Sequence, residues 1–557
     1  MCVPITVLDT SAALEDARAA KSAGADMVEF RIDGLPDFEE ATLAGVESLI
    51  AQCPLPCILT CRSSAEGGEC ELPDAERVAV LERLCAASKH PPTYLDVEWT
   101  SFSRSANLAQ KVRLCVQHAG QVREVGTRLI LSTHDFQQRP ADLSRRVAGM
   151  AGEGACGVVK AAWRARSVHD AMEALDLPGQ AGKPTVSLAM GEFGVMSRVL
   201  AGKLGGFLTF APLRAGGATA PGQVTLQELL GAYRFRSVGR TTKVYGVIGY
   251  PVSHSLSPLV HNAGFAAMNM DAVYVPIAVA GYADAGASYA GFRAAVLELI
   301  EHPRLDFCGA SVTMPHKENL ARLAVEMGWE MDRSSRDLLA ANTLVVDREN
   351  GRVGRIRIAN TDVEAVVGVL EGGPGVLSVS RETPARVGVI GAGGMGKAAA
   401  YACARAGAHV VIYNRDGERA RKVASEVATF AVPGAHITSA ELHLLPRANC
   451  HAFIQCTPLG MTGSGLENQS ALPIHDMHSC PRGVVVVETV YRPRRTPTVM
   501  AAEEKGWRVI TGDDVFVRQA VAQMEAWSGQ AGRGLLGLYA RLVAERPGNG
   551  SEEGGAA

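Results

Sequence analysis

Lys160 ends the apolar run Gly157–Lys160 (GVVK), and a lysine in such a position can do covalent chemistry. An ammonium that leaves water loses hydration, which costs free energy unless a carboxylate, a substrate or a lowered pKa compensates. Among apolar side chains and other cations the amine can become neutral and attack a ketone, and the iminium that forms acidifies the adjacent C–H bond. His134, on a neighbouring apolar run, could remove that proton and return it to a leaving hydroxyl. In the simpler interpretation, Lys160 reaches solvent and His134 is a hydrogen-bonded core residue.

Charged residues also occur within or at the ends of other apolar runs in the first 235 residues. They are Glu29, Arg31, Arg62, Asp96 and Glu98. Residues at i and i+2 of a strand share a face, so Glu29 and Arg31 face one side together, as do Asp96 and Glu98. A single charged residue in an apolar run does not by itself indicate a functional site. With the lysine and the histidine, however, charges lie on five different runs, and this recurrence predicts a site.

A glycine pattern in the second half of the chain predicts a dinucleotide site. The run RVGVIGAGGMGKAAAYACARAGAHVVIYNRD reads as strand, glycine turn, helix and strand, and Gly391, Gly393 and Gly396 form G-x-G-x-x-G. These glycines permit a tight turn and the close approach of a pyrophosphate to the helix N-terminus. Arg415, at the end of the second strand, favours a 2′-phosphate and therefore NADP, although Asp416 beside it would repel that phosphate. Alternatively, Arg415 is a solvated loop residue.

The elements that would position the first set of residues alternate between strands and helices from residue 1 to about 235. Eight short apolar runs are strand candidates: PITVLD, MVEFRID, CILTCR, YLDVEW, RLILSTHD, GVVKAAW, TVSLAM and FLTFAPL. Stretches between them, such as SAALEDARAAKSAG and DAERVAVLERLCAAS, have helical periodicity. Eight strands with crossover helices in ~230 residues predict a (β/α)8 TIM barrel, in which the carboxyl ends of the strands carry the chemistry.

The rest of the chain predicts a two-lobed α/β dehydrogenase. The polar stretch RSVGRTTK separates the barrel from a second βα pattern, and a Gly-rich break, LEGGPGVLSVSRETPAR, precedes the glycine loop. The sequence thus predicts a barrel at 1–236, a substrate-binding lobe at 242–362 completed by C-terminal helices at about 516–545, a Rossmann NADP-binding lobe at 363–515, and a disordered polar tail at 546–557.

Composition argues against several classes of function. The formal net charge of −3 gives no basis for a nucleic-acid partner, and no window approaches the ~20 uninterrupted apolar residues of a membrane span. The 13 cysteines are scattered without a CxxC or a zinc-like pattern, which indicates reduced thiols and no metal site. The N-terminus, MCVPITVLDT, reads neither as a signal peptide nor as a transit peptide, so we expect a cytosolic protein or one from which a targeting peptide is missing.

Residues 1–235 resemble type I 3-dehydroquinate dehydratase in the motifs VEFRID, RSSAEGGE, the His134 strand, GVVK, MSR and TAPGQ, which occur in this order. The resemblance implies that Lys160 forms a Schiff base, that His134 is the general acid and base, and that Glu66 orients the imidazole. It also implies substrate contacts from Glu29, Arg31, Arg62, Arg198, Thr219 and Gln223. Arginines suit this role because the substrate is a carboxylate, and the Gly/Pro-rich TAPGQ segment could close as a lid.

Residues 243–545 resemble shikimate dehydrogenase in the motifs GYPVSHSLSPLVHN, SVTMPHKE, AANTL, NTD, the glycine loop, NR, CTPLGM and VYRPRRTP. The resemblance implies that Lys317 and Asp362 form the catalytic pair, in which an ammonium held by a carboxylate protonates a ketone as hydride arrives. It implies a substrate site made of Ser255, Ser257, Thr313, Asn342, Tyr491 and Gln519, and a cofactor site made of Gly391, Ala392, Gly393, Gly394, Met395, Gly396, Asn414, Arg415, Thr457, Gly460 and Met461. In the simpler interpretation Lys317 is a solvated residue at a helix start and Asp362 is an N-cap.

The sequence departs from both family patterns at a few positions. Trp163 and Arg164 stand near the lysine where small residues are usual, which bears on the wall of the pocket. Glu364 and Ala365 follow NTD where a glycine is common, and Glu488 stands where an aspartate is usual.

The two resemblances imply a bifunctional dehydratase–dehydrogenase, as found in plants and some bacteria. Such an enzyme is a lyase and an oxidoreductase of chorismate and aromatic amino acid biosynthesis: it converts 3-dehydroquinate to 3-dehydroshikimate and reduces that ketone to shikimate. We expect small-molecule substrates, NADP(H) as cofactor without a metal, and a monomer with no nucleic-acid or membrane partner. In a plant or alga the enzyme would work in the plastid stroma without its transit peptide; otherwise it would be cytoplasmic.

Two other functions fit parts of the sequence. A quinate dehydrogenase would share the fold and the cofactor class, but Ser257 and Thr313 favour shikimate, because a bulkier substrate with an extra hydroxyl needs room there. A catalytically inactive sensor of pathway metabolites would be expected to lose at least one of the two lysines, the histidine and the aspartate of the catalytic sets. All four are present.

Overall fold

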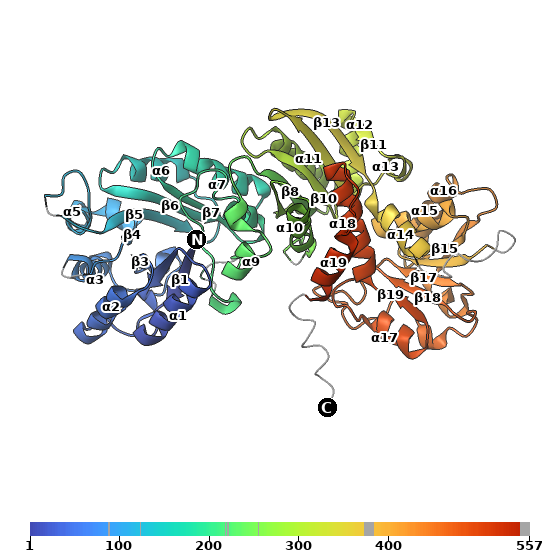
Figure 1. Cartoon of the computed structure of the whole chain (residues 1–557), viewed down its shortest axis with the longest axis horizontal. Coiled ribbons are helices and arrows are strands. Elements are labelled where there is room, and N and C mark those ends of the chain that lie inside the picture. The colour runs from blue at the N-terminus through green and yellow to red at the C-terminus, as the bar shows by residue number, and fades with distance from the viewer. Residues whose placement is uncertain are drawn as a thin grey trace. The chain divides into compact units, whose positions relative to one another are not determined.

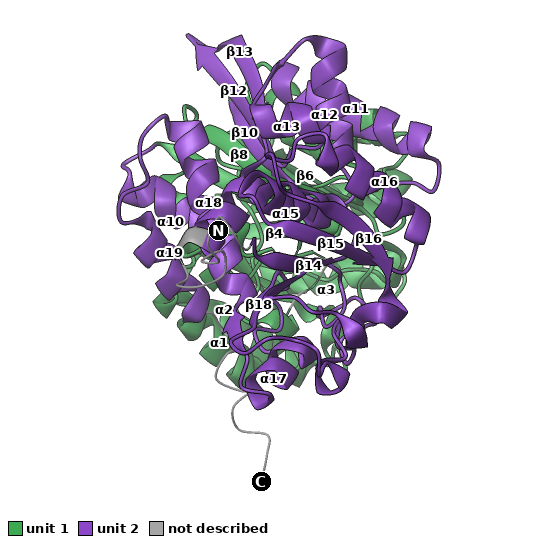
Figure 2. Ribbon diagram, turned by 90° about the vertical axis from the view of Figure 1, so that its right-hand side faces the viewer, with its two compact units in different colours: residues 1–258, 271–280, 302–306 green, residues 259–270, 281–301, 307–557 purple. Residues whose placement is uncertain are grey.

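The computed structural model describes residues 1–86, 90–122, 124–217, 219, 222–253, 255–372 and 384–545. The predicted tail and most of the Gly-rich break lie outside these residues. By internal packing the chain forms two compact units (Figure 2). One unit holds residues 1–258, 271–280 and 302–306, and the other holds 259–270, 281–301 and the chain from 307 onward.

Seven parallel strands, paired in chain order, form a curled sheet in the first unit (Figure 1). The strands are β1 (Cys2–Thr6), β2 (Met27–Arg31), β3 (Cys57–Thr60), β4 (Tyr94–Glu98), β5 (Arg128–Asp135), β6 (Cys156–Arg164) and β7 (Thr185–Met190). Between them run α1 (Thr10–Ser22), α2 (Glu40–Gln52), α3 (Asp74–Ala86), α4 (Trp99–Arg104), α5 (Ala106–Leu114), α6 (Leu143–Gly152) and α7 (Val168–Gln180). The first seven predicted strands are therefore present, and the two helical stretches singled out in the sequence are α1 and α3.

The eighth predicted strand, FLTFAPL, closes the barrel without becoming a regular strand. The backbone of Cys2 bonds both to Thr209 O, at 2.9 Å, and to the N–H of Ala211, at 3.0 Å. On the other side, Phe207 N donates to Thr185 O at 2.8 Å. Pro212 follows at once and has no N–H to donate, which explains why the pairing stops after a single bridge.

Helices and turns continue the first unit after β7. They are α8 (Val195–Val199), α9 (Leu226–Leu230) and short 3-10 helices, and the parallel pair β8 (Lys243–Gly249) and β9 (Ala272–Ala278) follows. The strands β3, β4 and β7 are buried at every position, as expected for parallel strands covered on both faces. Every polar side chain on such a strand therefore needs a partner inside the barrel.

The second unit begins with mixed pairing. Here β12 (Thr343–Glu349) runs antiparallel to β10 (Phe307–Val312) and β13 (Arg352–Ala359), and β11 (Glu330–Met331) is parallel to β13. The helices of this region are α10 (Ser257–Ala267), whose first two residues belong to the first unit, α11 (Ala285–Glu301), α12 (Lys317–Met327) and α13 (Arg333–Leu338), with α18 (Gly512–Ser528) and α19 (Leu535–Ala544) at the end of the described chain.

A doubly wound sheet forms the rest of the second unit. Its six parallel strands have the order β16-β15-β14-β17-β18-β19. They are β14 (Arg386–Ile390), β15 (His409–Asn414), β16 (Ile437–Glu441), β17 (Ala452–Gln455), β18 (Val485–Glu488) and β19 (Arg508–Ile510), with α14 (Thr361–Gly372), α15 (Gly394–Arg405), α16 (Gly417–Ala428) and α17 (Pro497–Glu504). Chain order reverses between β14 and β17, and ligands of such sheets bind in the crevice at the carboxyl ends of those two strands.

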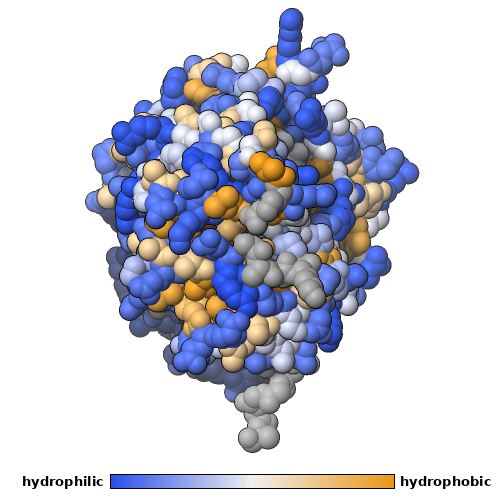
Figure 3. All heavy atoms as spheres, turned by 90° about the vertical axis from the view of Figure 1, so that its left-hand side faces the viewer, coloured by the Kyte–Doolittle hydropathy of each residue, from blue (hydrophilic) through white to orange (hydrophobic). Residues whose placement is uncertain are grey.

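The surface of the described chain is that of an ordinary globular protein. In Figure 3, polar side chains cover most of the visible face, and the apolar side chains between them form mostly small groups. Among the described helices, none is both long and apolar enough to cross a membrane. Within the described ranges no group of three or more His, Cys, Asp or Glu side chains could hold a metal ion, and all 13 cysteines are free.

Candidate active sites

Lys160 lies in the middle of β6, which continues to Arg164, in agreement with the predicted strand GVVKAAW. The residue is only 4% exposed. Its Nζ lies 2.9 Å from Oε1 of Glu29 and 2.8 Å from Oδ2 of Asp96, and 4.5 Å from the centroid of the Phe210 ring. Apolar side chains and cations such as Phe210 and Arg62 line the same cavity, and in addition two carboxylates, which the sequence did not single out for this role, compensate for the lost hydration of the buried ammonium.

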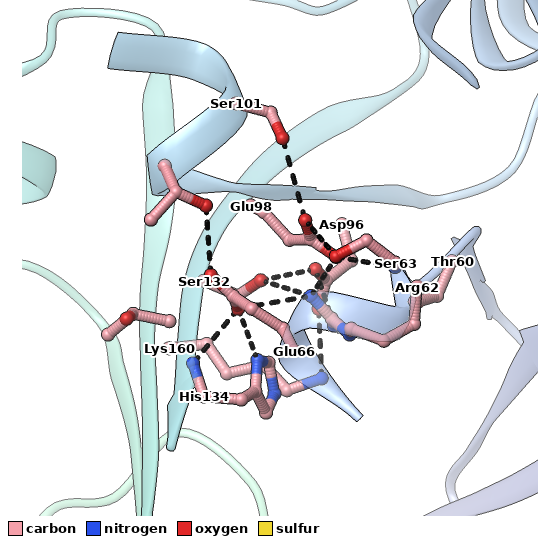
Figure 4. A network of polar contacts seen from close by, with 12 residues as sticks. Thr60, Arg62, Ser63, Glu66, Asp96, Glu98, Ser101, Ser132, His134 and Lys160 are labelled. Carbon is pink, nitrogen blue, oxygen red and sulfur yellow. Dashed lines mark hydrogen bonds and ion pairs between the residues drawn. The ribbon is translucent and has the colours of Figure 1, made fainter. Parts of the chain in front are cut away.

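Asp96 connects the lysine to Arg62 (Figure 4). Its Oδ1 accepts hydrogen bonds from Nη2 of Arg62 at 2.9 Å and from the Ser132 hydroxyl at 2.6 Å. Burial alone would raise the pKa of Asp96, but the charges of Arg62 and Lys160 lower it well below its usual value. The sequence analysis counted Asp96 among the strand charges that predict a site but gave it no role there, and it missed Ser132, whose residue type gave no signal.

His134, on β5, is held by Glu66. Oε2 of Glu66 accepts the backbone N–H of His134 at 3.0 Å and lies 3.1 Å from Nδ1 of the ring. Burial lowers the pKa of His134 well below its usual value, and the charges of Arg62 and Lys160 lower it further. The imidazole is therefore neutral at pH 7, and Nδ1–H donating to the carboxylate would leave Nε2 free to act as a base.

One cavity of the barrel collects all nine side chains of the predicted dehydratase site. Its lining includes Glu29, Arg31, Arg62, Glu66, His134, Lys160, Arg198, Thr219 and Gln223. The sequence analysis missed its apolar wall, made of Phe136, Ala162, Leu188, Met190 and Phe210. These residues continue ordinary core runs, so nothing in their pattern distinguished a pocket wall from packed core.

Trp163 and Arg164, which depart from the family pattern, do not line this cavity. Successive residues of a strand point to opposite faces, so Lys160 and Ala162 face the cavity while Trp163 faces away. Trp163 is fully buried in the core, and Arg164 is exposed at the end of β6. These two departures from the family pattern therefore do not alter the wall of the cavity.

Arg198, on α8, is a buried cation that could bind an anion. It is 1% exposed, and among the residues that the structure describes neither Nε nor Nη1 has a hydrogen-bond partner. Burial lowers the pKa of Arg198 to about 10. Leaving such donors unpaired costs free energy, and a carboxylate in the cavity could accept a charge-assisted hydrogen bond from this guanidinium.

The TAPGQ segment is described only in part, since Ala220 and Pro221 lie outside the described residues. Thr219 N donates to Oε1 of Gln223 at 2.9 Å, and both residues line the cavity. The prediction that this segment is a lid stays a prediction.

Lys317 and Asp362 meet in the second unit. Lys317 begins α12, and its Nζ is hydrogen-bonded to Oδ2 of Asp362. Oδ1 of Asp362 accepts from Nδ2 of Asn342 at 2.9 Å and from Nε2 of Gln519 at 2.6 Å. The carboxylate is thus saturated and buried, whereas the lysine side chain is 17% exposed and can be reached by a ligand.

Asp362 is not the N-cap of α14, contrary to the simpler interpretation of NTD. The helix begins at Thr361 and has Asp362 in its first turn. Oδ1 of Asn342 accepts the free N–H of Thr361 at 2.9 Å. The position of Asp362 in the first turn of a helix and its hydrogen bonds to Asn342 and Gln519 hold the carboxylate in place.

The remaining residues of the predicted substrate site are placed on loops and helix starts. Ser255 and Ser257 belong to the first unit, where Ser257 N donates to the hydroxyl of Ser255 at 3.2 Å at the start of α10. Thr313 is half-buried directly after β10, and Tyr491 follows β18 with its ring centroid 5.0 Å from that of Phe516. Of the predicted set, the structure brings Asn342 and Gln519 to the catalytic pair.

The glycine loop joins β14 to α15 as predicted. Gly391 has φ +105°, and a Cβ there would lie 2.9 Å from Cγ2 of Thr457. A Cβ on Gly396 would lie 2.0 Å from Gly391 O, whereas one on Gly393 would meet nothing within 4 Å. The loop is therefore too tight for side chains at its ends but open above Gly393, which suits the close approach of a pyrophosphate to the start of α15.

Thr457, Gly460 and Met461 form a second turn after β17. Thr457 N and Oγ1 both donate to Oε1 of Gln455, at 2.8 and 2.9 Å, and Gly460 has φ +81°. Because Thr457 packs against Gly391, both turns lie at the crevice between β14 and β17. Of the other predicted cofactor residues, Ala392 lies in the glycine loop and Met395 in the first turn of α15.

The glycine loop also contacts the Lys317 side chain. A Cβ on Gly394 would lie 3.3 Å from Cδ of Lys317. The lysine of the catalytic pair and the first turn of α15 are therefore neighbours, so a dinucleotide on this loop would lie beside Lys317.

Asn414 is the last residue of β15, Arg415 follows it, and Asp416 has a structural role. Oδ1 of Asp416 accepts from the backbone N–H of Glu418 at 3.0 Å and of Arg419 at 3.1 Å, so it caps α16. The cap explains an acidic residue beside a predicted phosphate site. Arg415 is exposed and available to a ligand.

Arg419 is a cation that the sequence analysis missed. Its Nε donates to Ala392 O of the glycine loop at 2.9 Å. Its spacing of four residues from Arg415, at a helix start, was the signal that could have found it.

Glu488, another departure, is fully buried at the end of β18. It accepts from Val490 N at 2.9 Å and from the Thr496 hydroxyl at 2.8 Å, and burial raises its pKa to about 7. Glu364 is exposed on α14, while Ala365 is buried.

Three known protein families match successive parts of the chain. Residues 1–240 match type I 3-dehydroquinase, and residues 247–344 match the substrate binding domain of shikimate dehydrogenase. Residues 386–443 match the family described as NADP oxidoreductase, coenzyme F420-dependent. The order of these matches agrees with the predicted order of a barrel, a substrate-binding lobe and a dinucleotide-binding lobe.

Similar proteins combine the same parts. A shikimate dehydrogenase (NADP(+)) of Carboxydothermus hydrogenoformans is 33% identical over 52% of this chain and 92% of its own length. A solved structure of the dehydroquinate dehydratase and shikimate dehydrogenase of S. pombe AroM covers 98% of both chains at 21% identity, with a TM-score of 0.41. The bifunctional 3-dehydroquinate dehydratase/shikimate dehydrogenase of Arabidopsis thaliana, a chloroplastic protein, is 34% identical over 95% of this chain and 82% of its own length. By this similarity the chain belongs to the family of bifunctional 3-dehydroquinate dehydratase/shikimate dehydrogenases.

Proposed function

We propose that this chain catalyses two consecutive reactions of the shikimate pathway, the dehydration of 3-dehydroquinate and the reduction of its product to shikimate. The observation that carries the first activity is the barrel cavity, which holds a buried lysine, a neutral histidine and an arginine with two unpaired donors. The observation that carries the second is the ion pair of Lys317 and Asp362 beside a dinucleotide-binding glycine loop.

The dehydration would begin at Lys160. Its ammonium must first lose a proton, for which Glu29 and Asp96 are the adjacent acceptors. The amine then attacks the ketone to form a carbinolamine, and the carboxyl that took the proton returns it to the carbinolamine hydroxyl. Water leaves, and the resulting iminium is stabilised by the two carboxylates. Arg198 would hold the substrate carboxylate.

His134 would move the second proton. The iminium acidifies the adjacent C–H bond, and the neutral imidazole removes that proton while Glu66 stabilises the imidazolium that forms. The imidazolium returns the proton to the departing hydroxyl, which leaves as water. Hydrolysis of the conjugated iminium frees the product and the amine, so the net change is the loss of one water from the substrate.

The reduction would use Lys317 as the proton donor. NADP(H) is the cofactor, and when bound it supplies the hydride. Lys317, held by Asp362, protonates the carbonyl oxygen, and Asn342 and Gln519, which already contact Asp362, would bind ring hydroxyls. Ser255, Ser257, Thr313 and Tyr491 would complete the substrate site. The open space above Gly393 fits a pyrophosphate, and Arg415 fits the 2′-phosphate.

Several further properties belong to the proposal. The domain bounds are those predicted from the sequence, with the barrel at 1–236, the substrate-binding lobe at 242–362 and the Rossmann lobe at 363–515. The enzyme acts on small molecules of the shikimate pathway as a monomer, without nucleic-acid or membrane partners. It works in the plastid stroma if its source is a plant or alga, as for the chloroplastic relative, and otherwise in the cytoplasm.

Two variants of the full chain test the proposal. Lys160→Ala should abolish dehydration of 3-dehydroquinate and leave reduction of 3-dehydroshikimate nearly intact, and Lys317→Ala should do the reverse. Borohydride with 3-dehydroquinate should label the unchanged protein at Lys160 but not Lys160→Ala. Loss of both activities in one folded variant, or labelling at another residue, would contradict the two-site assignment. A preference for quinate over shikimate would instead identify a quinate dehydrogenase.

A further inference from the structure

A single segment after β7 contacts parts of both candidate sites, all within the first unit. Gly191 follows β7 and precedes a 3-10 helix (Glu192–Gly194), and α8 then carries Arg198 into the dehydratase cavity. Gly222 packs closely on this segment, because a Cβ on it would lie 2.4 Å from Gly191 O. The segment is thus fixed by the barrel on one side.

On its other side this segment holds the loop that leads to Ser255 and Ser257. Oε1 of Glu192 accepts the backbone N–H of Val252 at 2.6 Å and that of Ser253 at 3.0 Å. Val252 is 2% exposed, so its N–H has no access to water and requires a protein acceptor. A carboxylate oxygen that accepts two backbone N–H groups forms strong, charge-assisted hydrogen bonds.

The contact continues toward the predicted substrate hydroxyls. Ser255 N donates to Val252 O at 3.1 Å, and Ser257 N donates to the Ser255 hydroxyl at 3.2 Å. Glu192, Val252, Ser255 and Ser257 therefore form one chain of hydrogen bonds. A shift at Glu192 would move the two hydroxyls that the proposed function assigns to the substrate carboxylate.

A contact between two aromatic rings also joins this segment to the loop. The rings of Phe193 and Tyr250 stack with their centroids 5.4 Å apart and their planes 13° from parallel. Two successive residues of the barrel segment thus contact the start and the middle of the loop.

We propose that Glu192 is a positioning residue for the dehydrogenase reaction: this carboxylate of the dehydratase barrel fixes the loop that presents Ser255 and Ser257 to the substrate carboxylate. The inference rests on the proposed function, because it concerns the substrate of that reaction. Glu192 itself touches neither substrate nor cofactor in this assignment. It acts on the affinity for shikimate through the loop, so it should affect KM and leave kcat alone.

The test measures oxidation of shikimate by the full chain at saturating NADP+. Glu192→Ala should raise KM for shikimate about tenfold, which corresponds to about 1.4 kcal/mol, and leave kcat and KM for NADP+ within about twofold. Glu192→Gln keeps an oxygen that can accept both N–H groups and should restore most of the affinity. Glu15→Ala removes an exposed carboxylate of α1 and serves as the matched control with unchanged constants.

The outcomes separate this inference from the proposed function. If the unchanged chain does not oxidise shikimate, the proposed function fails and the inference with it. If the unchanged chain is active and folded Glu192→Ala has the same KM, only the inference is overturned. A loss of kcat that Glu192→Gln does not restore indicates a general structural role and also overturns it. Should Glu192→Ala not fold, Glu192→Asp replaces it: the shorter carboxylate should raise KM severalfold, and an unchanged KM would refute the proposal.

Discussion

Oε2 of Glu66 holds both the backbone and the ring of His134, at 3.0 Å from the backbone nitrogen and 3.1 Å from Nδ1. The oxygen therefore fixes the position of the residue and the orientation of its imidazole at once. Burial raises the pKa of Glu66 to about 7, against the opposing effect of the Arg62 charge. The carboxyl consequently changes its charge near neutral pH, whereas His134 stays neutral there because burial lowers its pKa.

We expect Glu66 to set the acidic limb of the dehydratase pH profile. Its pKa is raised above the usual value of about 4.5, so the folded protein protonates this carboxyl as the pH falls through about 7. Protonated Glu66 cannot stabilise the imidazolium of His134, so kcat for dehydration should fall below pH 7. Glu66→Gln is neutral at every pH. It should lower kcat at pH 8 about 10- to 100-fold, the effect of a charged hydrogen bond of ~1.5–3 kcal/mol, and should flatten the profile.

Steady-state dehydration rates between pH 5.5 and 9 give the measurement. Glu69→Gln, which neutralises an exposed carboxyl in the same loop, is the control and should keep the unchanged profile. An acidic limb that persists near pH 7 in Glu66→Gln would assign that limb to another group.

Asp96 should contribute more to stability than any surface ion pair of the barrel. It lies between Lys160 and Arg62, at 2.8 and 2.9 Å, with its side chain fully buried. Asp96→Asn leaves both cations short of negative charge, and breaking a buried pair costs about 3–5 kcal/mol. We expect a clearly lower melting temperature of the barrel transition, measured by calorimetry of the full chain.

Asp142→Asn provides the comparison for that measurement. Asp142 pairs with Arg145 and Arg146 at the surface of the barrel. An exposed pair is worth about 0–1 kcal/mol, so this variant should melt close to the unchanged protein. If the two substitutions change the melting temperature equally, Glu29, Glu66 and Glu98 would be enough to stabilise the buried Lys160 and Arg62 without Asp96.

The sequence predicted that several residues of the candidate dehydratase site would lie together, because they are polar groups on apolar strands. The alternation of apolar runs and helices placed Glu29, Arg62, His134 and Lys160 at one end of a barrel, and their side chains line one cavity. It did not predict that two carboxylates flank the lysine, since pairing across a barrel depends on strand register and closure. The apolar wall was also unpredictable, because Phe210 and its neighbours look like core in any sequence.

For the fold, local pattern sufficed where elements are long and regular. The glycine loop, α1 and α3 appear where predicted, whereas the eighth barrel strand shrinks to a single bridge at Phe210 beside Pro212. Asp416 looked unfavourable because its nearest neighbour in sequence is Arg415, yet its carboxylate is used by α16. Capping depends on where a helix begins, and helix boundaries are the least certain part of a sequence-based prediction.

Two adjacent glycines of the dinucleotide loop should have different effects when each is replaced by alanine. A Cβ on Gly394 would lie 3.3 Å from Cδ of Lys317, and one on Gly393 would lie in open space. Gly394→Ala should displace the lysine by a few tenths of an ångström and lower kcat for the reduction about 10-fold or more, since small misplacements of catalytic groups are costly. Gly393→Ala should instead raise KM for NADPH, because its methyl group takes up the space of the pyrophosphate.

Melting temperature and dehydratase activity are the controls for both variants. The melting temperature and the dehydratase activity should both stay unchanged in Gly393→Ala. A methyl group at this position has no neighbour to displace, and alanine adopts the φ of −86° freely. The prediction fails if Gly394→Ala changes only KM for NADPH, since its methyl group would then act on the cofactor and not on Lys317.

Arg415 should determine the preference for NADPH over NADH. It is exposed at the end of β15, where a 2′-phosphate would lie, so Arg415→Ala removes a charge-assisted contact of ~1.5–3 kcal/mol and should raise KM for NADPH about 10- to 100-fold. KM for NADH should change little, because NADH has no such phosphate. Asp416→Asn is the matched partner: the amide oxygen can still cap α16 while the negative charge is lost, so KM for NADPH should fall slightly and the melting temperature should hold. Equal increases of KM for both cofactors in Arg415→Ala would move the phosphate contact elsewhere, and Arg419, which already reaches the glycine loop through Ala392 O, would be the next cation to substitute.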